Sequence, residues 1–170
     1  MRICGMRICG MRIWGMRIWA ITAAAMLAFP ADAQTARSPV PGLPAEARAA
    51  GATVEAFHAA LGRGDTRAAA ALLADDALVY ESGGVERGKA EYAAHHLAAD
   101  AAFARAVKRS VTRRAGSADG RTAWIASEAT VKGTYKTRAI DNVSTETIVL
   151  RLDPAGWRIV HIHWSLADAK

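Results

Sequence analysis

Two histidines, one residue apart, lie near the C-terminus in the stretch RIVHIHWS, residues 158–165. Alternate side chains of a β-strand point to the same face, so a strand here would place His161 and His163 side by side. Paired imidazoles can bind a transition metal, move protons beside a carboxylate, or hold a sheet together by hydrogen bonds. The rest of the chain must distinguish these three roles.

A carboxylate at an expected apolar position is the natural partner of this pair. Glu146 shares a predicted strand face with Ile148 and Leu150, and a buried carboxylate must be paired or lose its charge. Neighbouring antiparallel strands lie about 5 Å apart, so we expect His161 and His163 to lie opposite Glu146. A histidine beside a carboxylate can transfer protons near neutral pH. Glu146, His161 and His163 are therefore the catalytic candidates.

Three further strand residues are candidates for the same polar cluster. Tyr80 and Glu81 end an early predicted strand, and Glu128 lies in a later one. Two of them have structural alternatives: Glu81 can cap the turn at residues 83–84, and Glu128 can pair with a Lys or Arg across strands.

A helical histidine pair supplies the last candidate for this cluster. His95 and His96 point 100° apart on a helix, so at most one of them faces inward. His96 shares a stripe with Tyr92 and Phe103 and is the favoured inward residue. The alternative is that both histidines lie on the surface.

A second hypothesis is that some of these residues bind a metal ion. His161 and His163, joined by Glu81 or His96, would offer ligand types that suit zinc or another divalent transition metal. The sequence contains no His-Glu-x-x-His motif, and His-x-His alone is weak support. We therefore expect no cofactor and keep zinc as an alternative. A third hypothesis is that His161 and His163 have a purely structural role in a non-catalytic dimerisation or assembly domain.

The first half of the domain is predicted to be helical. Val54, Phe57 and Leu61 recur at helical spacing. The stretch 62–65 should end this helix, with Asp65 as N-cap of a second helix that ends near residues 75–76. A short strand at 77–82 and a third helix from about Lys89 follow.

The second half is predicted to be an antiparallel meander. Strand-like runs cover 106–116, 121–135, 139–152 and 156–166, separated by turn signals rich in Gly, Asp and Pro. Helices followed by strands indicate an α+β fold, with three helices packed on one face of a curved, mostly antiparallel sheet. The domain is expected to span residues 45–168, after a proline-rich linker at 34–44.

The N-terminal region carries the pattern of a secretory signal peptide. Four pentads begin MRI, and Met16 is the favoured translation start. An apolar run from Ile18 to Phe29 is followed by Pro30 and by Ala-Asp-Ala at 31–33, which resembles a cleavage site. The run is too short to span a bilayer. We expect residues 1–33 to be removed and the protein to be periplasmic or secreted, without stable membrane insertion after cleavage; an uncleaved anchor is the alternative.

Removal of this leader changes the composition. Both cysteines would be lost with it, so cysteine nucleophiles and disulfides are excluded from the mature chain. The formal net charge would fall from +6 to +3, because four arginines and one aspartate lie in residues 1–33. The basic run at 105–114 is expected to be a solvated strand face, and no nucleic-acid partner is expected.

The order of elements, together with three stretches of sequence, resembles the SnoaL-like branch of the nuclear transport factor 2-like superfamily, which has a cystatin-like cone fold. The stretches are VEAFHAALGRGDTRAAAALLADDALVYESGG, RGKAEYAAHHL and TETIVLRLDPAGWRIVHIHWS. The last one is also similar to the association domain of calmodulin-dependent kinase II. The resemblance implies a cone-shaped cavity between the helices and the concave sheet, with polar residues at its floor. We expect a small organic ligand to bind there, in a cavity lined by Tyr80, Glu81, His96, Glu128, Glu146, His161 and His163. The Asp or Asp–His pair of the isomerase and cyclase members does not carry over residue by residue.

Both faces of the last predicted strand carry bulky residues. Trp157 and Ile159 would lie on one face, and Val160, Ile162, Trp164 and Leu166 on the other. A sheet covered by helices on one face needs another cover for the second. We therefore predict a homodimer through the sheet face that includes Trp164.

Overall fold

The computed structural model describes residues 42–170. The expected signal peptide and nearly all of the expected linker lie outside these residues. Within residues 42–170, no helix is long and apolar enough to cross a membrane.

Five short helical segments make up the helical layer. They are η1 (Ala45–Ala47), α1 (Arg48–Arg63), α2 (Thr66–Ala71), α3 (Lys89–His95) and α4 (Leu97–Ala106). The apolar stripe of α1 is buried as predicted, and the helix ends at Gly64 in the left-handed conformation, with φ +73°. Asp65 caps α2, because its carboxylate accepts the Ala68 N–H at 2.9 Å. The predicted third helix is broken at His96 into α3 and α4.

Six strands form one sheet. They are β1 (Leu73–Glu81), β2 (Gly84–Glu86), β3 (Val107–Asp119), β4 (Thr122–Tyr135), β5 (Arg138–Asp153) and β6 (Gly156–Asp168), in the spatial order β2-β1-β6-β5-β4-β3. Strands β1 and β6 are parallel, and every other neighbouring pair is antiparallel. The α+β fold with a mostly antiparallel sheet is therefore confirmed.

The boundary between α2 and β1 differs from the prediction. Helix α2 ends at Ala71, and β1 begins at Leu73, within the segment predicted to be helical. The Leu72 carbonyl accepts the Ile159 N–H at 2.9 Å. This bond to β6 draws the segment into the sheet, and such a long-range contact leaves no local sequence signal.

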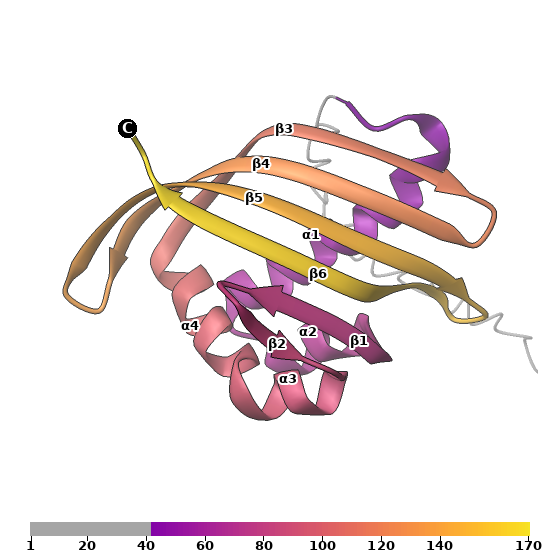
Figure 1. Ribbon diagram of the computed structural model, residues 1–170, viewed down its shortest axis with the longest axis horizontal. Coiled ribbons are helices and arrows are strands. Elements are labelled where there is room, and N and C mark those ends of the chain that lie inside the picture. Colours follow the sequence, from indigo (N-terminus) through magenta and orange to yellow (C-terminus); the bar gives the residue numbers. More distant parts are fainter. Residues whose placement is uncertain (1–41) are drawn as a thin grey trace, which may run out of the picture. The chain divides into compact units, whose positions relative to one another are not determined.

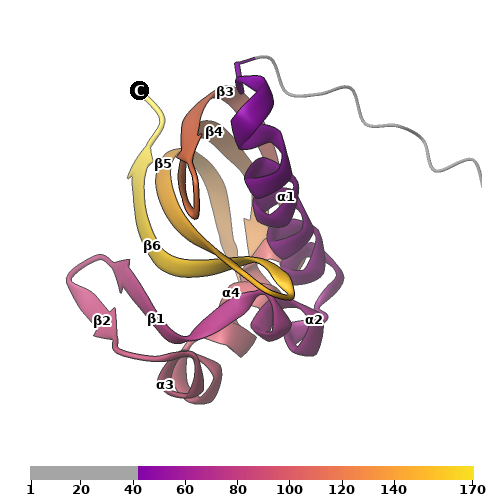
Figure 2. The ribbon, with the colours of Figure 1, turned by 90° about the vertical axis from the view of Figure 1, so that its right-hand side faces the viewer.

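The sheet is curved, and α1 lies on its concave side, which we call the inner face (Figures 1 and 2). The core lies between them: Val54 and Phe57 of α1 are fully buried, as are Ile125, Ile148 and Ile162 of three neighbouring strands. Burial alternates along β4 and β5, so every second side chain points inward.

Two irregularities shift this alternation. The β3–β4 register slips between Val111 and Arg113, and the β5–β6 register slips between Leu150, opposite Ile159, and Val149, opposite His161. Beyond such a β-bulge, side chains return to the inner face one residue out of phase. The slip in β6 leaves both Ile159 and Ile162 buried.

Candidate functional site

Glu146 lies in the middle of the inner face and is almost completely buried, with 1% of its side chain exposed. It belongs to a row of residues in register across five strands, which we call the polar row: Arg114, Ser127, Glu146, Trp164 and Glu81. The next inward-facing row, two residues along these strands, is apolar and contains Ile125, Ile148 and Ile162. The polar row therefore borders the apolar core on the inner face.

Three donors from three different elements converge on the Glu146 carboxylate. His58 Nε2 of α1 and Trp164 Nε1 of β6 each lie 2.6 Å from Oε2. Arg109 Nη2 of β3 donates to Oε1 at 3.2 Å. An ionised carboxylate only accepts hydrogen bonds, so the contacting His58 nitrogen carries the proton.

The pKa of Glu146 reflects two opposing influences. Burial alone would raise it, but the charge and the hydrogen bond of His58, with contributions from Arg109 and Trp164, lower the pKa to about 2. The carboxylate is therefore ionised at neutral pH and is a poor proton acceptor. Its role is to orient the side chains of His58, Arg109 and Trp164 by accepting their hydrogen bonds.

His58 and Arg109 are the accessible members of this cluster, with 18% and 21% of their side chains exposed. Because Nε2 of His58 is directed at Glu146, a neutral ring presents Nδ1 as an acceptor for a proton. The guanidinium of Arg109 uses one nitrogen on Glu146 and has no other hydrogen-bond partner among residues 42–170. The cluster thus offers a base and a cationic donor held by the same carboxylate.

The predicted pairing of His161 and His163 with Glu146 is wrong. Glu146 stands opposite Trp164, whereas Val149 and Thr147 stand opposite His161 and His163. Both histidines therefore lie on the convex, outer face of the sheet. The alternation within residues 161–164 was predicted correctly. The slip in register at Val160 breaks the alternation with Ile159, so the set that contains Trp164 faces inward and the two histidines face outward.

Tyr80 joins the histidines on the outer face instead of lining the cavity. Its ring centroid is 5.0 Å from that of His161 and 6.2 Å from that of His163. His161 Nδ1 also donates to the Leu78 carbonyl at 3.2 Å. These contacts tie β6 to β1, which fits the structural alternative for the pair.

Trp164 lies on the inner face, so its predicted place in a dimer interface is also wrong. Its ring stacks on Phe57 of α1 with a centroid distance of 6.2 Å, and its indole N–H binds Glu146. Trp164 is therefore part of the site and of the core.

Glu128 and His96 do not join the Glu146 cluster either. Glu128 is exposed and lies 3.5 Å from Arg113, the cross-strand pair that was the alternative reading. His96 lies at the break between α3 and α4, with 55% of its side chain exposed, and pairs with the buried Glu86 of β2. His95 is exposed. The helix break reorients His96 away from the inward stripe that an unbroken helix would form.

Glu81 does lie on the inner-face row, beside Trp164. Burial raises its pKa, and the nearby Asp100 raises it further, while His96 opposes the change. Asp100 in turn accepts a hydrogen bond from the buried Tyr92 hydroxyl at 2.6 Å. A second group of acidic side chains thus lies on the other side of Trp164.

The residues expected to bind a metal are dispersed over both faces. Across residues 42–170, no group of three or more His, Cys, Asp or Glu side chains is arranged to hold a metal ion. The described residues therefore offer no ligand set for the zinc alternative.

Sequence reasoning missed His58 and Arg109. A signal for His58 existed, because it lies four residues after Val54 and three before Leu61, beside the buried stripe of α1. Arg109 had no local signal, since it belongs to the run that was interpreted as a solvated face. The slip in β3 places Arg109 and Arg114 inward, while Arg113 between them is exposed.

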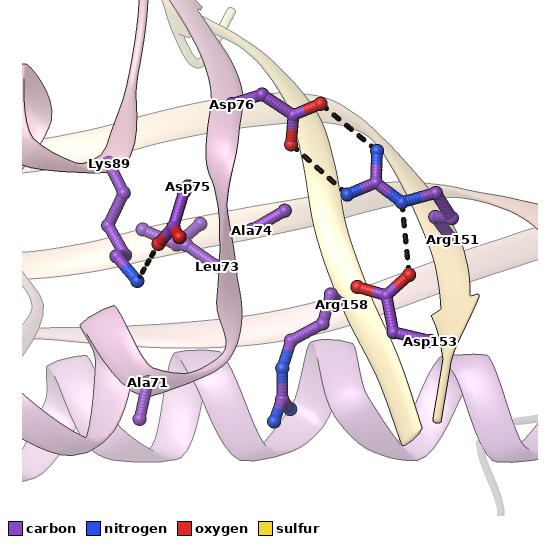
Figure 3. A pocket seen from close by; sticks show the side chains of 9 residues that line it. All are labelled: Ala71, Leu73, Ala74, Asp75, Asp76, Lys89, Arg151, Asp153 and Arg158. Atoms are coloured by element: carbon purple, nitrogen blue, oxygen red, sulfur yellow. Dashed lines mark hydrogen bonds and ion pairs between the residues drawn. The ribbon is translucent and has the colours of Figure 1, made fainter. Parts of the chain in front are cut away.

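A charged hollow of about 360 Å³ lies away from this cluster, where β1, β6 and the end of β5 meet α2 (Figure 3). Arg151 binds Asp76 through two hydrogen bonds of 3.0 and 3.2 Å and Asp153 through one of 3.1 Å. Lys89 pairs with Asp75. Most charges in the hollow neutralise one another, and no residue expected to line the cavity belongs to it.

Comparison with known proteins places the chain in a family. Residues 51–169 match the SnoaL-like domain. A proposed ketosteroid isomerase from Shewanella frigidimarina is 36% identical and has a TM-score of 0.68, over 73% of this chain and 99% of that one. No curated protein matches.

More distant structures share the fold. An NTF2-like protein with a cystatin-like fold from Novosphingobium aromaticivorans is 20% identical, over 74% of this chain and 84% of that one, with a TM-score of 0.61. A proposed calcium/calmodulin-dependent protein kinase II association domain from Xanthomonas campestris is 23% identical, over 73% of this chain and 89% of that one, with a TM-score of 0.63. With the family match over residues 51–169 and the curved sheet that covers α1, these similarities show that the chain belongs to the SnoaL-like family and has its cystatin-like cone fold.

Proposed function

We propose that the protein binds a small organic carbonyl compound on the inner face and transfers a proton on it, with His58 as the general base. The observation that carries this proposal is the 2.6 Å contact between His58 and the ionised, buried Glu146. A carboxylate that orients a histidine and balances its positive charge is a recurrent device for acid–base catalysis.

Arg109 supports a carbonyl compound as the ligand. When a base removes a proton next to a carbonyl, negative charge develops on the oxygen and needs a donor. The guanidinium of Arg109 is held on Glu146 Oε1, next to the oxygen that holds His58. His58 would accept the carbon-bound proton at Nδ1 and return it to another carbon, so that the ligand is isomerised without any net change in composition.

The similarity to a proposed ketosteroid isomerase supplies a first probe. A β,γ-unsaturated 3-ketosteroid should be converted to the conjugated enone, which is measured by ultraviolet absorbance. His58→Ala should lower the rate by about 100-fold or more, the usual contribution of a general base. His95→Ala is the matched control, because His95 is exposed and lies outside the Glu146 cluster. An inactive wild-type protein in this assay and in deuterium exchange of simpler ketones, or full activity of His58→Ala, would contradict the proposal.

A non-catalytic assembly role is the second candidate, and the outer face favours it. Tyr80, Trp124 and Val143 are exposed there by 37, 43 and 46%. The similar structures include association and hub domains of calmodulin-dependent kinase II. We propose a homodimer through this face in place of the one through Trp164. Light scattering should give twice the monomer mass, and Trp124→Glu should reduce it to the monomer mass; a wild-type monomer at micromolar concentration would exclude the dimer.

Export remains part of the proposal and depends on residues 1–33 alone. N-terminal sequencing of the protein from a bacterial periplasm should begin at Gln34, after the Ala-Asp-Ala pattern. A mature chain that begins before residue 30 would contradict cleavage at this site.

A further inference from the structure

Arg114 occupies an unusual position for a charged residue. It lies on the inner face with 2% of its side chain exposed, at the β3 end of the polar row. Its Nε donates to Ser127 Oγ at 3.1 Å, and its Nη1 donates to Glu55 of α1. Its Nη2 is buried and has no hydrogen-bond partner within residues 42–170. A buried donor without a partner is rare and destabilising in folded proteins.

Glu55 binds only one of the two terminal nitrogens of the Arg114 guanidinium. Its carboxylate contacts Nη1, whereas a carboxylate in the preferred geometry makes two parallel bonds to an arginine. The Glu55 side chain is 39% exposed, so it can turn into solvent when another anion takes its place at Arg114. The arginine is therefore held in place by Ser127, while its charged edge has an incomplete and replaceable partner.

We infer that Arg114 is an anion-binding residue for small organic carboxylates, and that Glu55 occupies the place of the ligand carboxylate in the free protein. A ligand carboxylate that replaces Glu55 would bind Nη1 and Nη2 together and would give the unpartnered nitrogen an acceptor. Glu55 then moves into solvent, and its contact with Arg114 is an autoinhibitory one.

This subsite is close to the Glu146 cluster but uses other residues. Glu55 and His58 lie one turn apart on the same side of α1. Arg114 and Glu146 are separated by one strand, which places their backbones about 10 Å apart. An organic acid bound at Arg114 would therefore extend along the polar row toward His58. Binding at Arg114 does not depend on proton transfer by His58.

The competing explanation is that Arg114 and Glu55 only connect α1 to β3. Removal of Glu55 has opposite consequences in the two cases. If Glu55 only connects the two elements, Glu55→Gln weakens the fold and leaves carboxylate binding unchanged. If Glu55 competes with a ligand, the same substitution strengthens carboxylate binding.

Benzoate is a suitable probe, with benzamide as its uncharged counterpart of similar shape. Binding is measured by calorimetry on the folded wild-type protein and on Glu55→Gln and Arg114→Lys. We expect Glu55→Gln to bind benzoate about five- to tenfold more tightly than the wild type and benzamide with unchanged affinity. Arg114→Lys keeps the charge but loses the two-nitrogen edge, so it should bind benzoate at least tenfold more weakly.

Glu128 and Arg113 provide matched controls, because they form an exposed pair on the same two strands as Arg114 and Ser127. Glu128→Gln and Arg113→Lys should leave benzoate binding unchanged. Glu55→Gln alone decides the outcome if Arg114→Lys does not fold. Benzoate affinity that is unchanged, lower or undetectable in Glu55→Gln would overturn the inference.

The result also separates this inference from the proposed function. Benzoate binding that depends on Glu55 and Arg114, in a protein that transfers no proton to or from a ketone, would retain the subsite and reject the catalytic role. Proton transfer that depends on His58, without any effect of Glu55→Gln on benzoate binding, would retain the catalytic role and reject the subsite.

Discussion

His58 and Glu146 are 88 residues apart in the sequence, yet their side chains meet at 2.6 Å between Nε2 and Oε2. The contact joins the middle of α1 to the middle of β5 across the concave side of the sheet (Figure 2). A buried carboxylate costs free energy unless donors replace its water. The pair therefore fixes how α1 lies on the sheet, besides presenting a histidine on the inner face.

Substitution of His58 should destabilise the fold as well as affect chemistry. His58→Ala leaves Glu146 with two of its three donors, so we expect a loss of about 1–3 kcal/mol in the free energy of unfolding. Urea denaturation followed by circular dichroism gives this value. His95→Ala serves as the control and should change stability by no more than about 0.5 kcal/mol, because His95 is exposed and lies outside the Glu146 cluster. Equal effects of the two substitutions would show that the buried contact contributes nothing.

Acid should remove the stabilisation that Glu146 provides. Its pKa is about 2 in the folded protein, below its ordinary value, so the folded state binds fewer protons than the unfolded state between these values. Stability from this residue is complete above about pH 5 and is lost as the pH falls toward 2, by about 3 kcal/mol for a shift of this size. The free energy of unfolding, measured by urea denaturation between pH 2.5 and 7, should therefore depend less steeply on pH in Glu146→Gln than in the wild type. Identical slopes would contradict the low pKa.

The fold could be predicted because its signals are local. The stripe of Val54, Phe57 and Leu61, the cap at Asp65 and the turns between strands are each written in a few adjacent residues. The break at His96 was missed, because no proline or glycine marks it.

The site could be predicted only in part because it depends on register. Glu146 was identified, since a carboxylate that shares a predicted strand face with Ile148 and Leu150 is visible in the sequence. Its partners were not, because which residue of β6 stands opposite it follows from the turn and from the slip in register between β5 and β6. The slip in β3 hid Arg109 and Arg114 in the same way.

Trp164 should contribute through its indole N–H as well as through packing. Trp164→Phe keeps an aromatic ring against Phe57 and removes the donor to Glu146. Hydrogen bonds to charged groups contribute about 1.5–3 kcal/mol, so a loss of this size is expected in urea denaturation. Trp124→Phe is the matched control, because the Trp124 indole N–H donates to no residue among 42–170, and both variants are compared with the wild type at one protein concentration. A loss in Trp164→Phe no larger than that of the control would mean that the indole N–H adds nothing to the packing.

Glu81 should affect the pH dependence of stability in the opposite sense to Glu146. Burial and Asp100 raise its pKa, so the folded state binds more protons than the unfolded state once the pH exceeds the ordinary value. The cost of ionising Glu81 is absent below about pH 4, where both states are protonated, and grows as the pH rises through the raised pKa. Glu81→Gln should therefore have a higher melting temperature than the wild type at pH 7, and this gain should disappear at pH 3.5. Glu128→Gln, which removes an exposed carboxylate paired with Arg113, should show no such gain at pH 7. A lower melting temperature of Glu81→Gln at pH 7 would show that the ionised carboxylate stabilises the fold.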